Sequence, residues 1–403
     1  MQFIIIFLAV FFLPSICSAA TIEITDSRAT PEYWISRNVN GDKVLLTPEK
    51  IALFNAQILA KDNFSADLAN LNEKVSAIEV NNAIKEVEGD DYNKTHRAVI
   101  DMPMRYAVTT RRGNIRVLPQ PWNGDKYDDF QGSAIDPAEA VAVFCESPDG
   151  QFVFVRSRYY MGWLNKSDLA FTDRKTWLSY VNPQDFLVVT ANKKIIEIGK
   201  QALLFQMGAI IPIVNPNDQD DIWIARLPVS VNGQLAEVKV NIAMNDKDVN
   251  KGFLACTENN FIRQAFKFLG DEYGWGGLND SVDCSAFMQD VYHSMGIKIP
   301  RDTGNQRSFM PIWAVFNNVN NAERWDIVSR APIGSLFHKP GHVMMKLGND
   351  AEGRPLIIHA ASSYIDNDNG KVYIRKVIVS DLHYRGGSIE TIDALTDIVF
   401  YGD

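Results

Sequence analysis

The chain has 403 residues, a length that predicts two to three domains. Hydrophobic residues make up 46% and charged residues 22%, which is typical of globular proteins and excludes wholesale disorder. The 40 basic residues are outnumbered by 49 acidic ones, and the net charge of -9 without basic runs argues against nucleic-acid binding. Four cysteines without a CxxC pair fit neither a disulfide scaffold nor a zinc ribbon.

The N-terminus carries an apolar run over residues 4–13, followed by Pro14 and small residues that end at Ala20. This pattern predicts a signal peptide over residues 1–20, cleaved near Ala20, with a retained anchor as the alternative. Cys17 raises the possibility of a lipoprotein, but the three residues before it make a poor lipobox. The run is short for a membrane span. We therefore expect an exported protein, periplasmic or secreted into the cell envelope, with no stable membrane span.

Three cysteines remain after the predicted leader: Cys145, Cys256 and Cys284. An odd number in an exported protein means that at least one thiol is free or pairs with another chain.

Residues 21–100 are polar and contain helical stretches. Thr47 and Pro48 favour the start of a helix, because threonine is a good N-cap and proline suits the first turn. Apolar residues follow at helical spacing: Ile51, Phe54, Ile58 and Leu59. We expect this segment to pack against the rest of the molecule or to clamp it.

Short strands dominate the next part of the chain. Residues 141–144 and 152–155 flank a Pro-Asp-Gly turn signal. The later strands are predicted at 161–164, 186–190, 210–214, 222–227 and 237–242. Strands at this spacing indicate two small β-barrels, over residues 101–173 and 174–250, rather than βαβ units. Either barrel can also be a spacer or docking module without chemistry of its own.

Residues 251–403 have a different pattern. Phe261, Ala265, Phe268 and Leu269 share one helical face, and Gly270 follows as a stop signal. A glycine-rich stretch over 273–277 separates this helix from a second one, predicted from Cys284 to about Met295. Strands are expected to fill most of the remainder.

Cys284 is the sharpest candidate for chemistry, because it falls in the first turn of the second helix. Free N–H groups and the helix dipole at that position stabilise an anion, so we expect a lowered thiol pKa and a reactive thiolate. The alternative is a small buried hydrophobic residue, which Cys145 and Cys256 fit.

A hairpin is predicted to bring two histidines together. Apolar strands at 343–347 and 356–360 are separated by a polar turn. In an antiparallel pair centred between Asp350 and Ala351, His342 and His359 stand opposite each other at the open end. One of them can act as general base to Cys284, and the other can orient it, in a Cys-His-His triad.

A zinc site is the competing interpretation of the same residues. His338 and His342 are four residues apart, and Cys284 and His359 can complete a tetrahedron. Pro340 and the following glycine prevent a helical HxxxH arrangement, so we expect no metal.

Five motifs in order resemble the NlpC/p60 cysteine peptidases over about 150 residues. They are Tyr273-Gly274-Trp275-Gly276-Gly277, Asp283-Cys284-Ser285-Ala286-Phe287, the stretch from Pro300 to Gln306, Gly341-His342-Val343 and Ile358-His359-Ala360. Leu118-Pro119, residues 127–134 and residues 160–163 are similar to the first bacterial SH3-like barrel of the multi-domain subgroup, and residues 47–59 to its N-terminal clamp.

The resemblance implies an α+β fold with five parts. A papain-like NlpC/p60 peptidase domain over residues 251–403 follows two SH3-like barrels at 101–173 and 174–250. A mostly helical clamp over 21–100 precedes them, after the signal peptide at 1–20. The implied activity is hydrolysis of peptidoglycan stem peptides at the bond between γ-D-glutamate and a diamino acid, through a thioester and without a cofactor.

The resemblance also implies roles for individual residues. Cys284 is the implied nucleophile, His342 the base and His359 the orienting residue, although the third position varies within the family. Asp283 is implied to meet the free amino group of an N-terminal L-alanine. The implied pocket residues are Tyr273, Trp275, Ser285, Thr303 and a barrel tyrosine, either Tyr159 or Tyr160. Threonine at position 303 departs from the serine that is also common there.

A carboxylate at Asp283 that attracts the amino group of L-alanine would favour released stem peptides, in which this amine is free, over intact wall. Two other classes of function compete with this hypothesis. One is a wall-binding adaptor without catalytic activity, and the other is an amidase or acyltransferase on the same fold.

Overall fold

The structure is a computed structural model that describes residues 23–92, 103–217, 221–366 and 368–402. The predicted leader over residues 1–20 lies outside these ranges. Within them, no helix has the length and apolar character needed to cross a membrane.

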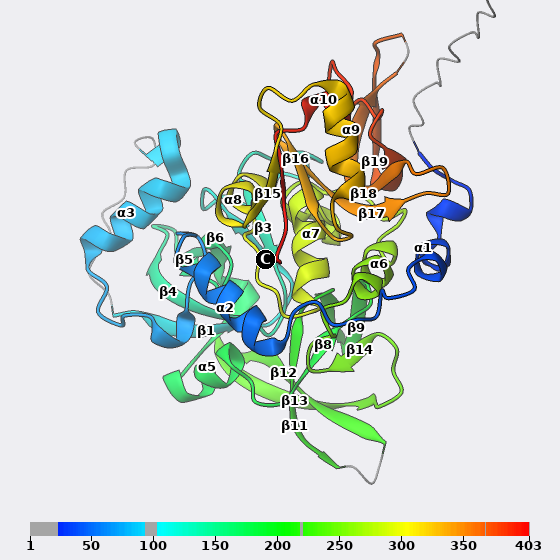
Figure 1. Cartoon of the computed structure of the whole chain (residues 1–403). Coiled ribbons are helices and arrows are strands. Elements are labelled where there is room, and N and C mark those ends of the chain that lie inside the picture. The colour runs from blue at the N-terminus through cyan, green and yellow to red at the C-terminus, as the bar shows by residue number, and fades with distance from the viewer. Residues whose placement is uncertain (1–22, 93–102, 218–220, 367, 403) are drawn as a thin grey trace, which may run out of the picture.

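The N-terminal segment carries three helices: α1 (Pro31–Arg37), α2 (Pro48–Leu59) and α3 (Ala77–Glu88). The prediction for α2 is confirmed, since the Thr47 side chain accepts from the Lys50 N–H and Pro48 occupies the first turn. α2 buries Phe54 and Ile58, and α3 begins with a Ser76–Glu79 capping box. As Figure 1 shows, this segment crosses the molecule, from α1 beside α6 to α2 and α3 on the side of the first strands.

Fourteen strands and helix α5 (Arg174–Val181) follow between residues 105 and 251. The first group is β1 (Arg105–Thr109), β2 (Gly113–Arg116), β3 (Gln131–Ile135), β4 (Ala140–Glu146), β5 (Phe152–Arg156), β6 (Met161–Asn165) and β7 (Leu169–Thr172). The second group is β8 (Phe186–Val189), β9 (Lys193–Ile198), β10 (Gln201–Gln206), β11 (Ile210–Asn217), β12 (Ile222–Val231), β13 (Gln234–Ala243) and β14 (Val249–Lys251). All seven strands expected from the sequence in this region are present.

The two groups share one sheet. Its order is β14-β8-β11-β12-β13-β7-β1-β4-β5-β6-β2-β3, and β9 and β10 form a separate pair. β7 and β13 join the groups through a parallel contact between Phe171 and Gln234. The first seven strands bury two faces, one around Val143 and Val155 and one around Trp163, as expected for a closed-up small sheet.

The C-terminal part combines helices with a six-stranded antiparallel sheet, in the order β15-β20-β16-β17-β18-β19. Its helices are α6 (Glu258–Phe266), α7 (Cys284–His293), α8 (Thr303–Phe309), α9 (Asn321–Arg330) and α10 (Thr391–Ala394). Its strands are β15 (Ile312–Val315), β16 (Leu336–Lys339), β17 (His342–Asn349), β18 (Pro355–Ile365), β19 (Lys371–Asp381) and β20 (Asp397–Val399). The predicted α+β class is confirmed.

Two helix ends differ slightly from the sequence prediction. α6 ends at Phe266, and tighter turns carry the chain through Phe268 to Gly270, whose φ of 86° ends the segment. α7 ends at His293 rather than near Met295. Both apolar faces still enter one core, in which α7 packs through Phe287 and Val291 against β17 and β18.

Helix α2 of the N-terminal segment is hydrogen-bonded to the C-terminal part through Asn55. The Asn55 side chain donates to the Gly296 carbonyl at 2.9 Å and accepts from the Lys298 N–H at 2.7 Å. It thereby fixes the chain that leads from α7 to α8.

Replacing Asn55 should loosen this attachment. Asn55→Ala leaves one buried donor and one acceptor without partners, and we expect a loss of about 1–3 kcal/mol in the free energy of unfolding. Gln57→Ala, on the exposed face of α2, is the matched control and should be neutral. Chemical denaturation of both variants measures the difference, and equal stabilities would contradict the role of Asn55.

Candidate active site

Cys284 occupies the first position of α7, where the sequence places it. Asp283 caps the helix by accepting from the Ala286 N–H at 2.7 Å. The cysteine is buried, with 7% of its surface exposed, and its sulfur lies 3.7 Å from the Thr303 Oγ1. The backbone N–H of Val343 faces the thiol and favours its ionised form. Thr303 at the start of α8 and Val343 on β17 therefore border the sulfur.

His342 and His359 lie in contact, with 2.9 Å between the Nε2 of His342 and the Nδ1 of His359. The predicted register is wrong by two residues, because Met345 stands opposite Ile358 where the prediction placed Leu356. A bulge between Lys346 and Gly348 and a turn further along the chain cause the shift. A two-residue shift keeps both imidazoles on the same face, so they meet diagonally rather than directly opposite.

The hydrogen bonds assign the protons of both rings. The Ser380 hydroxyl donates to the Asp381 carbonyl at 3.2 Å, so its oxygen accepts from the Nε2–H of His359 at 3.1 Å. The Nδ1 of His359 is then the acceptor for the Nε2–H of His342. This arrangement leaves the Nδ1 of His342 with a lone pair, as a general base requires.

The structure brings the sulfur and the histidine pair to the same place. The thiol faces the N–H of Val343, the residue that follows His342, and α7 packs directly against β17. The Nε2 of His342 is committed to His359, so Nδ1 is the ring nitrogen available to the thiol. Cys284, His342 and His359 thus lie on α7, β17 and β18, three elements of which α7 packs against the other two.

The expected lowering of the thiol pKa is wrong. Burial and the charge of Asp283 raise the pKa of Cys284 to about 11, and they outweigh the contacts with Thr303 and Val343. The free N–H groups at the helix start are not sufficient to offset removal of the thiolate from water. At neutral pH the resting cysteine is therefore a thiol.

The imidazole pKa values move in the opposite direction. Burial lowers the pKa of His342 well below its usual value, and His359 and Lys339 lower it further. Burial likewise lowers the pKa of His359 to about 3. The shifts favour a neutral thiol and neutral imidazoles at neutral pH.

Asp283 lies inside a buried network rather than at an open surface. Its carboxylate forms an ion pair with Arg301 at 2.8 Å and also accepts from the Gly276 N–H and the Ser285 hydroxyl at 3.1 Å each. Arg301 in turn donates to the Ser285 oxygen and to the Ser133 hydroxyl of β3. Asp283 and Ser285, both predicted to contact substrate, are thus held among internal donors and acceptors.

The two predicted aromatic residues of the glycine-rich stretch, Tyr273 and Trp275, have different neighbours. Burial and the charge of Cys284 raise the pKa of Tyr273, which places the phenol close to the sulfur. Trp275 packs against Tyr127 of the first strand group, with ring centroids 4.4 Å apart. The first strand group makes a second contact with the glycine-rich stretch, because the Gln131 side chain donates to the Gly276 carbonyl.

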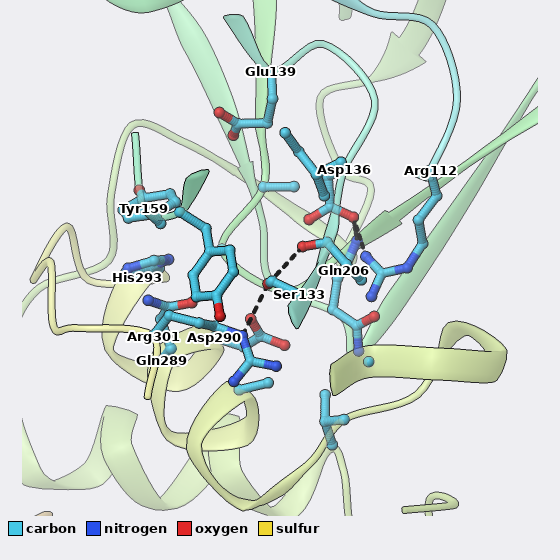
Figure 2. Close-up of a pocket in the computed structure, with 18 of the residues that line it drawn as sticks. Arg112, Ser133, Asp136, Glu139, Tyr159, Gln206, Gln289, Asp290, His293 and Arg301 are labelled. Carbon is cyan, nitrogen blue, oxygen red and sulfur yellow. Dashed lines mark hydrogen bonds and ion pairs between the residues drawn. The ribbon is translucent and has the colours of Figure 1, made fainter. Parts of the chain in front are cut away.

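Tyr159 and Tyr160 point to different sides. Burial and Asp302 raise the pKa of Tyr160, and Arg301 and Asp283 also act on its phenol, so this ring lies on the Cys284 side. Tyr159 stacks on His293 with centroids 4.2 Å apart. Both tyrosines line the cavity in Figure 2, where Tyr159 and His293 are drawn with Asp290 and Gln206. Tyr160 lies nearer the Asp283–Arg301 pair, and Tyr159 lies against His293.

The zinc interpretation receives no support from the geometry. Across the described ranges, no group of three or more His, Cys, Asp or Glu residues is arranged to hold a metal ion. The Nδ1 of His338 lies 3.1 Å from the Oδ1 of Asp397 instead of joining His342 and Cys284.

Comparison with protein families identifies two parts of the chain. Residues 270–379 match the NlpC/P60 family, and residues 118–165 match SH3 domains of the SH3b1 type. This chain carries an NlpC/P60 domain. NlpC/P60 peptidases are cysteine peptidases, so the match agrees with a hydrolase that acts on peptidoglycan, and the SH3 domain agrees with action outside the cytoplasm.

A curated relative and two solved structures are similar to the chain. The γ-D-glutamyl-L-lysine dipeptidyl-peptidase of Bacillus subtilis (strain 168) is 41% identical over 51 residues, which span 12% of this chain and 17% of that protein. An NlpC/P60 endopeptidase of Photobacterium damselae subsp. piscicida shares the fold at a TM-score of 0.69 and 15% identity, covering 95% of this chain and 96% of its own. An NlpC/P60 family protein of Bacillus cereus ATCC 10987 has a TM-score of 0.52 at 18% identity, over 74% of this chain and 100% of its own.

Sequence analysis missed three residues of this site. Ser380 fixes the ring protons of His359, and its position two residues from the end of a strand gave no signal. Arg301 was noted only as part of a motif, although it neutralises Asp283. Lys339, on β16, donates to the Thr391 hydroxyl at 3.0 Å and acts on both imidazoles; its own pKa is lowered to about 8 by burial.

The raised thiol pKa predicts slow alkylation at neutral pH. A group with a pKa of about 11 is ionised to about one part in 10⁴ at pH 7. The rate of Cys284 alkylation by iodoacetamide should therefore rise about tenfold per pH unit between pH 7 and 10. Mass spectrometry of the labelled peptide measures this rate, with Cys284→Ala correcting for the other two thiols. A rate that levels off below pH 8 would show that the thiolate forms more easily than the site indicates.

Proposed function

We propose that the protein hydrolyses the bond between γ-D-glutamate and a diamino acid in peptidoglycan stem peptides with a free N-terminal L-alanine. The observation that carries the proposal is the hydrogen-bonded chain from Ser380 through His359 to His342, which ends beside the buried Cys284. The Bacillus subtilis relative, named for a γ-D-glutamyl-L-lysine bond, supports the choice of substrate over a short stretch of sequence.

The proposed reaction begins with the neutral thiol of Cys284. The sulfur attacks the carbonyl carbon of the γ-D-glutamyl bond while the Nδ1 of His342 takes the thiol proton. His359 accepts the Nε2–H bond of the resulting imidazolium and holds the ring in place, as the third member of a triad does. The imidazolium then protonates the leaving amine. Water activated by the same nitrogen hydrolyses the thioester and restores the thiol.

The carbonyl oxygen becomes negative during each step and needs donors near the sulfur. The N–H of Cys284 is at the first position of α7, where helical N–H groups have no partner within the helix. The Tyr273 phenol lies close to the sulfur and is held in its protonated form. We assign these two donors to the oxyanion.

The free amine of the substrate requires an acceptor that the fold does not already use. Five internal donors surround Asp283, so its negative charge contributes at a distance. Asp302 precedes Thr303 and caps α8 without a side-chain hydrogen bond, and among the described residues its carboxylate has no hydrogen-bonding partner. Burial raises the pKa of Asp302, Arg301 lowers it, and Asp283 and Asp62 raise it, with a net upward shift; an ammonium group would favour the charged carboxylate. We therefore place the L-alanine amine at Asp302, beside Tyr160.

Two alternatives predict different products. A catalytically silent adaptor would bind the peptide without turnover, and an amidase or acyltransferase would transfer the acyl group to a nucleophile other than water. Incubation with L-Ala-γ-D-Glu-diaminopimelate and identification of the fragments distinguishes all three. Release of L-Ala-D-Glu and free diaminopimelate is the expected result.

Cleavage should depend on the triad in a graded way. Cys284→Ala should reduce turnover by about 10⁴-fold or more. His359→Ala should cost less than the loss of the nucleophile, and His359→Asn should recover part of the rate because its amide oxygen can accept from His342. His383→Ala, at a half-exposed histidine paired with Glu390, is the control and should be neutral. Unchanged turnover in Cys284→Ala would remove the proposed nucleophile.

Recognition of the amine predicts a coupled effect between substrate and Asp302. Asp302→Asn should lower kcat/KM for the free-amine peptide by about tenfold, because the ammonium loses its charged partner. Acetylation of the L-alanine should weaken cleavage by the natural chain, and Asp302→Asn should add little to that loss. Equal effects of the substitution on free and acetylated peptides would show that Asp302 does not meet the amine.

A further inference from the structure

A second cavity lies between the N-terminal segment, the first strand group and the segment after α7. Its volume is about 390 Å³, within the range of small-molecule sites. None of the residues that surround Cys284 lines it. Its walls come from α2, the loop before α3, the Arg158-Tyr159 turn, the end of α5 and Lys298-Ile299. Figure 1 shows α2 and α5 on the side of the molecule where these segments meet.

Two cations stand at one end of this cavity. Lys298 is partly buried, and its ammonium forms no hydrogen bond or ion pair with any of the described residues. Arg158 is also partly buried and donates to the Val181 carbonyl at 2.5 Å, which fixes its guanidinium. The two charges act on each other, and together with burial they lower the pKa of Lys298 to about 8.

The nearby carboxylates do not neutralise the pair. Asp67 lines the same cavity, but it is exposed and accepts from the Asn70 side chain at 2.8 Å. Glu139 lines the other cavity, on the far side of Tyr159, and burial raises its pKa. Both carboxylates act on Lys298, but neither forms an ion pair with it. An unpaired, partly buried ammonium beside a guanidinium favours an anion.

The remainder of the lining is mixed: the polar side chains are Asn55, Ser65, Asp67, Asn70 and Asn182, and an aliphatic wall makes up most of the rest. This wall is formed mostly by short aliphatic side chains: Ala52, Ala56, Leu59, Ala66, Leu68 and Ile299. A small polar anion would leave this surface unused, whereas a neutral apolar molecule would leave the two cations without a partner.

The geometry points to a binding site for a small amphipathic carboxylate, separate from the Cys284 site. The carboxylate group lies between the Lys298 ammonium and the Arg158 guanidinium, and an aliphatic chain extends along the alanine and leucine side chains. This assignment rests on the cavity itself and does not depend on the proposed peptidase reaction.

Hexanoate is a suitable probe, because it combines one carboxylate with a short aliphatic chain. Isothermal titration calorimetry on the full chain should show binding of hexanoate, with hexan-1-ol and acetate each at least about tenfold weaker. Equal binding of hexan-1-ol would overturn the role of the two cations, and equal binding of acetate would overturn the role of the aliphatic wall. Absence of hexanoate binding would overturn the site.

Lys298→Met keeps an aliphatic side chain without its charge and should weaken hexanoate binding by about tenfold or more. Lys298→Arg should restore it. In the natural chain the affinity should fall above pH 8 as the ammonium loses its proton, whereas Lys298→Arg should bind independently of pH up to 10. An unchanged affinity in Lys298→Met would contradict the proposal.

Ala66→Leu keeps the test decisive if Lys298→Met does not fold. It narrows the cavity at a residue whose N–H donates to the Arg158 carbonyl and leaves both charges in place, so hexanoate should bind more weakly; unchanged binding would place the ligand elsewhere. Cys284→Ala should bind hexanoate as the natural chain does, since the sulfur is not part of the lining. A loss of binding in Cys284→Ala would instead place hexanoate at the catalytic cysteine.

Discussion

The buried ion pair between Asp283 and Arg301 is the interaction on which the arrangement of the site depends. Asp283 caps the helix that begins with Cys284, and it also holds the N–H of Gly276 in the preceding loop. Arg301 carries the same network across to Ser133 in the first strand group. Removing one partner from a buried pair typically costs about 3–5 kcal/mol, because the other charge is left without compensation. The start of α7, the glycine-rich loop before it and the first strand group are thus all held by this ion pair.

Burial and, after it, the same carboxylate raise the pKa of Cys284 and favour a neutral thiol. A fixed negative charge next to the thiol opposes a second negative charge on sulfur, and Arg301 offsets this effect only in part. The buried imidazoles, with Lys339 nearby, resist a positive charge for the corresponding reason. An ion pair between thiolate and imidazolium is therefore unfavourable before substrate arrives. The proposed general-base mechanism, in which charge develops only during attack, fits this electrostatic environment.

Local patterns predicted the elements of this fold well, and long-range packing determined what they missed. The Thr47-Pro48 start of α2 and the Asp283-Cys284 start of α7 depend on neighbouring residues, so the sequence displays them directly. The contact between His342 and His359 was predicted because a shift of two residues keeps the same face, although the bulge after Lys346 changed the register itself. The pKa of Cys284 was predicted in the wrong direction, because a helix start is visible in sequence while burial is not. Ser380 and Lys339 reach the site only through sheet pairing, which no local pattern records.

The short connection between α7 and α8 explains why the site needs the whole molecule. Within six residues, Lys298 borders the second cavity, Ile299 accepts from Gln289 of α7, and Arg301 pairs with Asp283. Thr303, which follows Asp302, then lies at the sulfur. Asn55 of α2 fixes the start of this connection and Ser133 of β3 fixes its middle. A stretch this short cannot shift at one end without moving the other, so the N-terminal segment and the first strand group hold residues that face Cys284 even though they supply neither the nucleophile nor the base.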